Sequence, residues 1–273
     1  MLHLNIYDNL FTHAASSNIL KQSKYITWHS NRCHHKDAYD TFYTESHIDE
    51  VFKHEHIPGK KYAWLVESKD IMPHAITKVL NNIIKYTSVY DMIFTNCDKL
   101  IELNPDRCKW LSTLGIQPTI PTDIPPKSKI VSCISSNKHS CAGHKERLTY
   151  VMSHRHEFDL YGRGIRNINT VDEGLKDYMF SVTIENAQYN TYFTEKILNC
   201  FALGTIPIYR GCPRIGDFFD TRGIIELTDD FDYKTLTSEL YYSKMDAILD
   251  NFETCKKYEV AEDYMYLIYL INL

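Results

Sequence analysis

Short hydrophobic runs alternate with helical patterns along the whole chain. Runs bounded by turn-forming residues predict β-strands, whereas apolar residues three and four positions apart predict amphipathic helices. In the first part we expect strands at 2–7, 25–28, 62–66 and 92–95, and helices at 73–86 and 97–103. In the second part we expect strands at 130–134, 158–161, 179–184, 205–209 and 223–227, helices at 144–152 and 195–203, and a helical C-terminus. This alternation predicts an α/β fold with parallel sheets.

A cluster of prolines separates the two parts. Four of the nine prolines lie within 115–127, where neither a regular helix nor a central strand can form. We therefore predict a hinge there and two Rossmann-like domains, 1–122 for an acceptor and 123–273 for a nucleotide sugar. A ligand would bind in a cleft at the carboxyl ends of the strands. The helical end at 264–273 could pack across the first domain or against another module.

Composition narrows the classes of partner. The 30 Lys and Arg residues are outnumbered by 35 Asp and Glu, giving a net charge of -5 without a basic stripe, so nucleic acid is not expected as a partner. No apolar run approaches the ~20 residues of a membrane span. Polar residues near the N-terminus interrupt any signal-peptide core, so we expect a cytoplasmic protein. The eight cysteines form no C-x-x-C pair and are expected to be reduced thiols.

The most informative stretch runs from Phe180 to Gly211 and has the pattern of strand, loop, helix and strand. Thr194 is a suitable N-cap, and Glu195 and Lys196 open the helix. Free N–H groups, the helix dipole and the Lys196 ammonium would favour a diphosphate at this helix end, and Glu195 could accept hydrogen bonds from a ribose. The structural alternative is that Glu195 only stabilises the first helical turn and Lys196 is solvated.

This segment resembles the donor-binding motif of family 10 glycosyltransferases, the α-1,3/1,4-fucosyltransferases. The resemblance rests on Ile184-Glu-Asn186, Tyr192-Phe-Thr-Glu-Lys196 and Gly204-Thr-Ile-Pro-Ile-Tyr-Arg-Gly211. It extends over most of 130–228 and is weaker in the first part. It implies a GT-B fold, in which two Rossmann-like domains face a cleft, and a GDP-sugar donor, GDP-fucose in the characterised members.

The resemblance also implies roles for individual residues. Glu195 would hold the ribose, Lys196 and Arg147 the diphosphate, and Tyr192 and Asn186 the donor at the end of the strand. The loop before Arg147 adds three donor-binding candidates, namely Ser135, Asn137 and Lys138. Arg210 departs from the family pattern, in which Trp or another apolar residue is common, and this departure bears on the identity of the donor sugar.

Inverting transfer needs a general base that removes the proton of the acceptor hydroxyl. In the family this is a Glu at the end of a first-domain strand, and the nearest match here is Glu67 in Trp64-Leu-Val-Glu-Ser68. A carboxylate at the carboxyl end of a strand suits this task, and a positioned base is typically worth ~10²–10⁴ in rate. The alternative is that Glu67 only caps the following loop or pairs with a basic residue.

Metal-binding patterns are present but incomplete. Asp230-Phe-Asp232 fits the Asp-x-Asp pattern of metal-dependent glycosyltransferases, but N-capping of the following helix explains these acids. His54-Glu-His56 and Cys33-His-His35 lack a partner cluster at the spacing of a structural metal site. We therefore expect no metal and no cofactor besides the donor substrate.

The leading prediction is an inverting glycosyltransferase that moves a sugar, fucose from GDP-fucose, to a hydroxyl of a glycan acceptor. The first alternative keeps the fold and changes the donor to another GDP-hexose, because of Arg210. The second is a non-catalytic module that binds a nucleotide sugar or a glycan, and it would be preferred if Glu67 were buried away from the cleft. Other modules of a longer chain stay open as partners.

Overall fold

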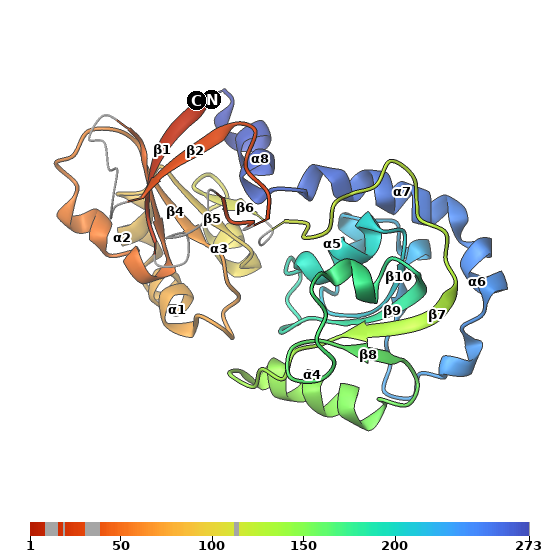
Figure 1. Ribbon diagram of the computed structural model, residues 1–273. Helices are drawn as coiled ribbons and strands as arrows, with labels where there is room; N and C mark the ends of the chain where they lie inside the picture. The colour runs from red at the N-terminus through yellow and green to blue at the C-terminus, as the bar shows by residue number, and fades with distance from the viewer. Residues whose placement is uncertain (9–15, 19, 31–38, 112–114, 273) are drawn as a thin grey trace. The chain divides into compact units, whose positions relative to one another are not determined.

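A computed structural model describes the chain except for residues 9–15, 19, 31–38, 112–114 and 273. The chain forms two compact units (Figure 1). The first unit contains Met1–Gly115 together with Val260–Leu273, and the second contains Ile116–Glu259. Each unit is a parallel sheet with helices, which confirms the predicted α/β class and its two Rossmann-like domains.

The first unit is built on a six-stranded parallel sheet with the spatial order β2-β1-β3-β4-β5-β6. The strands are β1 Leu2–Tyr7, β2 Ile26–Ser30, β3 Thr41–Thr44, β4 Lys61–Leu65, β5 Met92–Thr95 and β6 Cys108–Trp110. The helices are α1 Pro73–Asn81, α2 Ile83–Thr87, α3 Asp98–Leu103 and, after the second unit, α8 Ala261–Met265. The strand order reverses between β1 and β3, so ligands are expected beyond the carboxyl ends of these central strands.

Each face of the first sheet has its own hydrophobic core, because successive strand residues point to opposite faces. On one face, Trp64 of β4 belongs to a cluster that includes Ala261 and Met265 of α8. On the other face, Leu65 belongs to a cluster that includes Ile76 of α1. The strands are therefore buried on both sides, as the near-continuous apolar runs predict.

The C-terminal segment is part of the first unit, which corrects the predicted assignment of all of 123–273 to the second domain. Its apolar residues cover the first sheet, and its buried carboxylate ties it there. Glu262 of α8 accepts hydrogen bonds from the backbone nitrogen and hydroxyl of Ser17, both at 2.6 Å, and from Trp28 Nε1 at 3.1 Å. A fully buried carboxylate is tolerated because these donors satisfy it.

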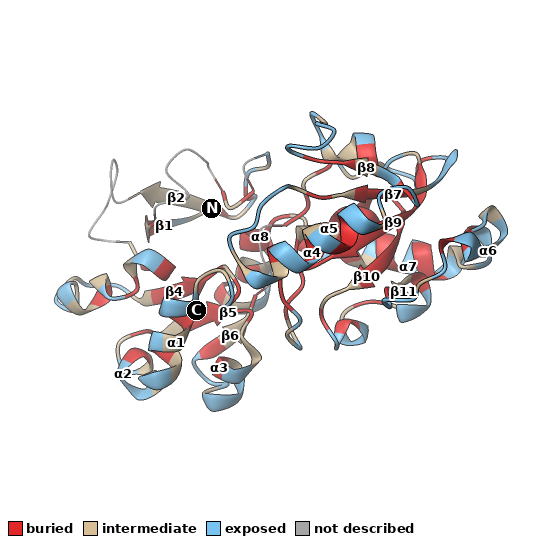
Figure 2. Cartoon of the chain, turned by 90° about the horizontal axis from the view of Figure 1, so that it is seen from below, coloured by how far each residue is buried: buried red, intermediate tan, exposed pale blue. Residues whose placement is uncertain are grey.

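The second unit is built on a five-stranded parallel sheet with the order β11-β10-β9-β7-β8. The strands are β7 Lys129–Ile134, β8 Asp159–Tyr161, β9 Tyr178–Ile184, β10 Ile206–Arg210 and β11 Ile225–Glu226. The helices are α4 Ala142–Ser153, α5 Glu195–Ala202, α6 Ser238–Ser243 and α7 Met245–Cys255. Every residue of the central strand β9 is buried (Figure 2). The strand order reverses between β7 and β9, which marks the expected ligand-binding edge.

The proline-rich segment packs on the second unit from Ile116 onward, so the units divide earlier than the predicted 122–123. The backbone nitrogen of Gln117 donates to Asn199 Oδ1 at 2.9 Å. Gly204, which ends α5 with a φ of 64°, leaves room for Ile124: a Cβ there would lie 2.3 Å from the Ile124 side chain. The predicted hinge segment is therefore anchored over most of its length.

Most predicted elements occur close to their expected positions, with two omissions and one division. Strands β3 and β6 were not predicted, because both are short and lack a long apolar run. The expected helix at 73–86 is divided into α1 and α2 at Asn82, whose φ of -134° is not helical. Among the helices of the described residues, none has the length and apolar character needed to cross a membrane.

Candidate active site

The end of β9 and the start of α5 are joined through one buried carboxylate. Glu185 accepts hydrogen bonds from the backbone nitrogen of Thr194 at 2.9 Å and from its hydroxyl at 2.7 Å. The Thr194 hydroxyl in turn caps α5 by accepting from the backbone nitrogen of Lys196 at 3.3 Å. The first turn of α5 is therefore fixed at the carboxyl edge of the sheet, and the predicted N-cap is confirmed.

Two carboxylates hold the Lys196 ammonium. Its Nζ lies 3.3 Å from Glu185 and 3.3 Å from Glu195, and donates to the Thr194 hydroxyl at 3.0 Å. Burial alone would lower the pKa of Lys196, but Glu195 and Glu185 outweigh it and raise this pKa above its usual value. Burial would likewise raise the pKa of Glu195, but the Lys196 charge outweighs it and lowers that pKa. The site therefore carries a fixed cation and a fixed carboxylate side by side.

Arg147 of α4 supplies a second cation, which is buried. Its side chain is largely buried, and one guanidinium nitrogen donates to Asn186 Oδ1 directly after β9. Its Nε is buried and has no hydrogen-bond partner among the described residues. Gly143 permits this contact, because a Cβ there would lie 1.8 Å from the Asn186 carbonyl oxygen. A buried N–H donor without a partner is costly, so Arg147 has capacity for an acceptor group from a ligand.

The loop after β7 carries the remaining donor-binding candidates. Ser135 and Asn137 donate their backbone nitrogens to the carbonyls of Tyr161 and Arg163, at 2.8 and 3.2 Å. A Cβ on Gly162 would lie 1.8 Å from the Ser135 carbonyl oxygen, so this glycine turn supports the loop. Ser135 is buried, whereas Asn137 and Lys138 are exposed.

His144, on the first turn of α4, was not singled out from the sequence. Burial and the nearby charges of Arg147, Lys138 and Lys196 lower its pKa to about 4. Burial is the largest cause of this shift and the three cations add to it, so positively charged side chains gather at this edge of the sheet. Such side chains favour an anionic ligand.

A cavity of about 160 Å³ lies where these groups meet, at the reversal of strand order between β7 and β9. Ser135, Arg147, Glu195 and Lys196 line it, together with the end of β9. Asn186 does not line it and acts on it through its hydrogen bond to Arg147. Tyr192 does not line it either, and its side chain is buried.

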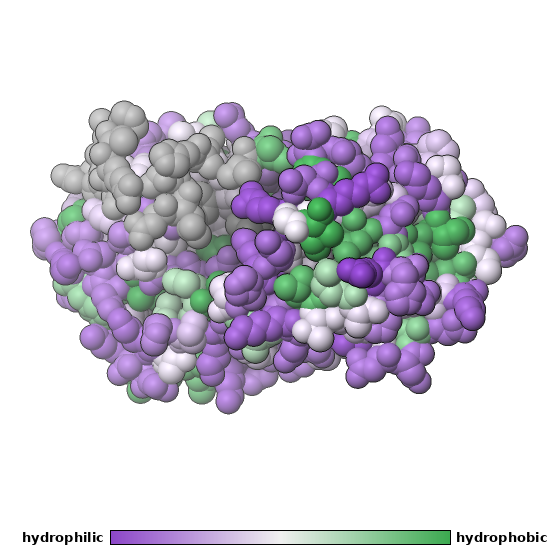
Figure 3. Space-filling view, turned by 60° about the horizontal axis from the view of Figure 1, so that its bottom comes forward, coloured by the Kyte–Doolittle hydropathy of each residue, from purple (hydrophilic) through white to green (hydrophobic). Residues whose placement is uncertain are grey.

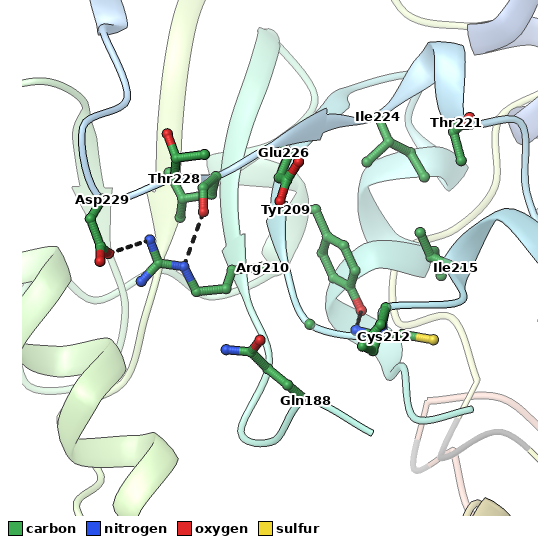
Figure 4. A pocket seen from close by; sticks show the side chains of 13 residues that line it. Gln188, Tyr209, Arg210, Cys212, Ile215, Thr221, Ile224, Glu226, Thr228 and Asp229 are labelled. Carbon is green, nitrogen blue, oxygen red and sulfur yellow. Dashed lines mark hydrogen bonds and ion pairs between the residues drawn. The ribbon is translucent and has the colours of Figure 1, made fainter. Parts of the chain in front are cut away.

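A second, larger cavity of about 650 Å³ lies beyond the ends of β10 and β11 (Figure 4). Arg210 lines it and is held in place: it donates to the Leu227 carbonyl at 3.1 Å and to Asp229 at 2.8 Å, and its guanidinium lies over the Tyr150 ring. On the face drawn in Figure 3, hydrophobic residues gather on the second unit within a mainly hydrophilic surface. The two cavities share no lining residue. Arg210, the residue that departs from the family pattern, therefore lies outside the cavity that Lys196 lines.

Glu67 lies at the carboxyl edge of the first sheet, just after β4, and is half-buried. Its backbone nitrogen donates to Oε1 of Glu45 at 2.7 Å. Glu45 follows β3, and sequence reasoning missed it because β3 itself was missed. The sequence signal that could have identified Glu45 is its position as a carboxylate directly after the short run Thr41-Phe-Tyr-Thr44.

Two residues of the metal-like patterns, Asp232 and His54, have other contacts. Asp232 caps a short 3₁₀ helix by accepting from the backbone nitrogen of Lys234 at 3.0 Å, as predicted. His54 lies 3.1 Å from the Tyr43 hydroxyl. Within the described ranges, no three His, Cys, Asp or Glu side chains come together as a metal site would require. The Cys33-His-His35 pattern lies outside those ranges.

Comparisons with protein families and with known proteins both find fucosyltransferases. The family model described as "Glycosyltransferase family 10 (fucosyltransferase) C-term" matches residues 124–265. The chain is 32% identical over 78 residues to the alpha-(1,3)-fucosyltransferase FucT of Helicobacter pylori, covering 29% of this chain and 16% of that protein. It is 29% identical over 109 residues to alpha-(1,3)-fucosyltransferase B of Drosophila melanogaster, covering 34% and 24%. The aligned parts thus span less than a quarter of these relatives.

Solved structures with a similar fold include a crystal structure of an alpha1,3-fucosyltransferase, with a TM-score of 0.53, 16% identity and coverage of 92% of this chain and 81% of that chain. HepE of Anabaena, solved with UDP and glucose, has a TM-score of 0.61 at 7% identity and full coverage of both chains. At sequence identities this low, the structural similarity shows only that the fold is shared. Together with the family match over more than half of the sequence, it places the chain in glycosyltransferase family 10, with a GT-B-type fold of two Rossmann-like domains.

Proposed function

We propose that this chain is an inverting glycosyltransferase that moves fucose from GDP-fucose to a hydroxyl of a glycan acceptor. The observation that carries the proposal is the cavity at the β7–β9 edge, where the unpartnered Nε of Arg147 and the ammonium of Lys196 meet beside the amino end of α5. These are the groups that a diphosphate requires. Family membership and the GDP-fucose bound to a solved fucosyltransferase of the same fold support the choice of donor.

The donor would be held by groups of the second unit. Lys196 and Arg147 would bind the diphosphate, and the Glu195 carboxylate, kept ionised by Lys196, would accept hydrogen bonds from the ribose. Ser135, Asn137 and Lys138 would contact the donor from the loop after β7. Asn186, which also accepts from Arg147, and Tyr192 would hold the donor at the end of β9.

In the reaction, Glu67 would accept the proton of the acceptor hydroxyl while its oxygen forms a bond to the anomeric carbon of the sugar. The bond between that carbon and the β-phosphate oxygen breaks on the opposite face, and GDP leaves. Lys196, Arg147 and the α5 terminus would meet the developing charge, and charge-assisted hydrogen bonds are worth roughly 1.5–3 kcal/mol each. With these cations in place, we propose that no divalent metal is needed.

Donor identity is tested by thermal shift with GDP, UDP, CDP and their sugars. A ligand at 100 times its Kd should add about 2.7 kcal/mol of stability. Lys196→Ala should weaken GDP binding, whereas Lys145→Ala, on the exposed side of α4, should leave it unchanged. A preference for UDP, or equal GDP affinity in the wild type and Lys196→Ala, would overturn the donor assignment.

The base is tested by turnover of GDP-fucose. Glu67→Gln should lose turnover by roughly 10²–10⁴-fold while retaining GDP binding, since only the proton acceptor is removed. Turnover by Glu67→Gln at the wild-type rate would assign the base to another residue.

A further inference from the structure

Two carboxylates lie at the ends of neighbouring strands of the first sheet. Glu45 follows β3 directly, and Glu67 follows β4 after one residue. The two strands are parallel, with Thr44 paired to Trp64, so both acids lie at the carboxyl edge. Glu45 is buried, with 6% of its surface exposed, whereas Glu67 is half-buried. Glu67, the general base of the proposed function, therefore lies close to a second acid, Glu45, that is almost inaccessible to solvent.

The backbone around Glu67 is held from both sides. Its own nitrogen donates to Glu45 Oε1 at 2.7 Å. The carbonyl of the preceding Val66 accepts from the buried Asn96 amide at 2.9 Å. On the other side of Glu45, the Thr44 hydroxyl donates to Asp8 Oδ1 at 2.5 Å. Side chains at the ends of three strands, β1, β3 and β5, therefore help to fix the position from which the Glu67 carboxylate extends.

We propose that Glu45 is a positioning residue for the general base: its carboxyl group holds the backbone of Glu67, and a charge on this carboxyl group strengthens the neighbouring Glu67 carboxylate as a base. The proposal rests on the proposed function of Glu67. Both residues belong to the first unit.

The electrostatics of the pair agree with this role. Burial raises the pKa of Glu45 to about 7, the N–H of Glu67 opposes that rise, and the negative charge of Glu67 adds to it. Below this pH, Glu45 is neutral. Above it, a second negative charge lies beside Glu67 and makes its carboxylate a stronger base.

Among the described residues, most of the other titratable groups near Glu45 contact other partners. Its short helix, Glu45–His47, packs against β3, β4 and α1. The groups on and around these elements are His47, which packs on Tyr7; His74, which is exposed; Lys78, which pairs with Asp49; Lys61, which bonds the Ile57 carbonyl; Tyr43, which bonds His54; and Asp8, which bonds Thr44. The charge acting most strongly on Glu45 is therefore that of Glu67.

The test uses Glu45→Gln in the full chain, because glutamine keeps the shape and an acceptor oxygen for the Glu67 nitrogen but cannot ionise. The first readout is the NMR titration of the Glu67 side-chain carboxyl in protein labelled with ¹³C-glutamate. In the wild type this resonance should show a second step near pH 7, and in Glu45→Gln the step should disappear. Glu55→Gln, an exposed acid of the same unit, should retain it.

The second readout is release of GDP from GDP-fucose with water as the acceptor, from pH 5.5 to 8.5. Glu45→Gln should match the wild type at pH 5.5 and be roughly three- to tenfold slower at pH 8, with an unchanged KM for GDP-fucose. Superimposable Glu67 titrations in the wild type and Glu45→Gln would overturn the inference, whatever the activity. Full turnover by Glu67→Gln would instead refute the base assignment, so the two failures are distinguishable.

Discussion

Removal of the Glu185 carboxylate should destabilise the second unit strongly. In Glu185→Ala, the backbone nitrogen and hydroxyl of Thr194 lose their acceptor, and Lys196 loses one of its two carboxylate partners. The Glu185 side chain is completely buried, so water cannot replace these bonds without disturbing the loop.

The magnitude follows from the number and kind of bonds lost. Hydrogen bonds to a charged group contribute roughly 1.5–3 kcal/mol each, and breaking a buried ion pair by removing one partner costs about 3–5 kcal/mol. These terms overlap because they share one acceptor, so we expect a total loss of about 3–5 kcal/mol. For a domain of this size that corresponds to a fall in Tm of roughly 6–20 °C.

The assay is calorimetric melting of Glu185→Ala beside Asp229→Ala. Asp229 also pairs with a cation of the second unit, Arg210, but its side chain is 92% exposed. Exposed pairs are worth no more than about 1 kcal/mol, so the control should melt close to the wild type. Equal losses in the two variants would refute the reasoning, because burial would then not be what makes the Glu185 contacts strong.

Three further predictions concern the second unit. Gly143→Ala should weaken GDP binding at least tenfold in a thermal-shift titration, because its Cβ would meet the Asn186 carbonyl at 1.8 Å and push α4 away from the β9 loop; unchanged affinity would contradict this. His144 has a folded pKa of about 4 against an ordinary value of 6.5, so unfolding takes up a proton and the unfolding free energy should fall as the pH drops from 6.5 to 4. Urea unfolding at pH 7.5 and 4.5 should show a smaller loss in His144→Asn, and equal losses would exclude this role. Lys127→Met should lower the unfolding free energy by about 1.5–3 kcal/mol, because its ammonium donates to the carbonyls of Lys176 and Leu203; an unaltered urea midpoint would argue against it.

The second unit was more predictable from the sequence than the first, for a physical reason. Strand β9 is buried along its whole length, so its residues must be continuously apolar and are easily identified. The cap at Thr194 and the glycine at Gly204 mark the ends of α5 by local rules. Local rules therefore located the edge of the sheet where the donor-binding candidates gather.

What the sequence did not reveal depends on contacts between distant residues. Strand β3 is short, and its place between β1 and β4 follows from the order of the sheet, which no local pattern encodes. The contact between Glu45 and Glu67 depends on this strand order, because the two residues are 22 positions apart in the sequence. The tail at 264–273 was expected to be helical and to pack either across the first domain or against another module, and the structure shows that it belongs to the first unit.

The returning tail has a consequence for folding during synthesis. All of the second unit, Ile116–Glu259, leaves the ribosome before the residues that complete the first. Until Ala261 and Met265 arrive, one side of the first sheet, including Trp64, lacks its covering and can meet chaperones or other exposed chains. A nascent chain halted just after Glu259 would therefore contain a complete second unit and a first unit whose sheet is exposed on one face.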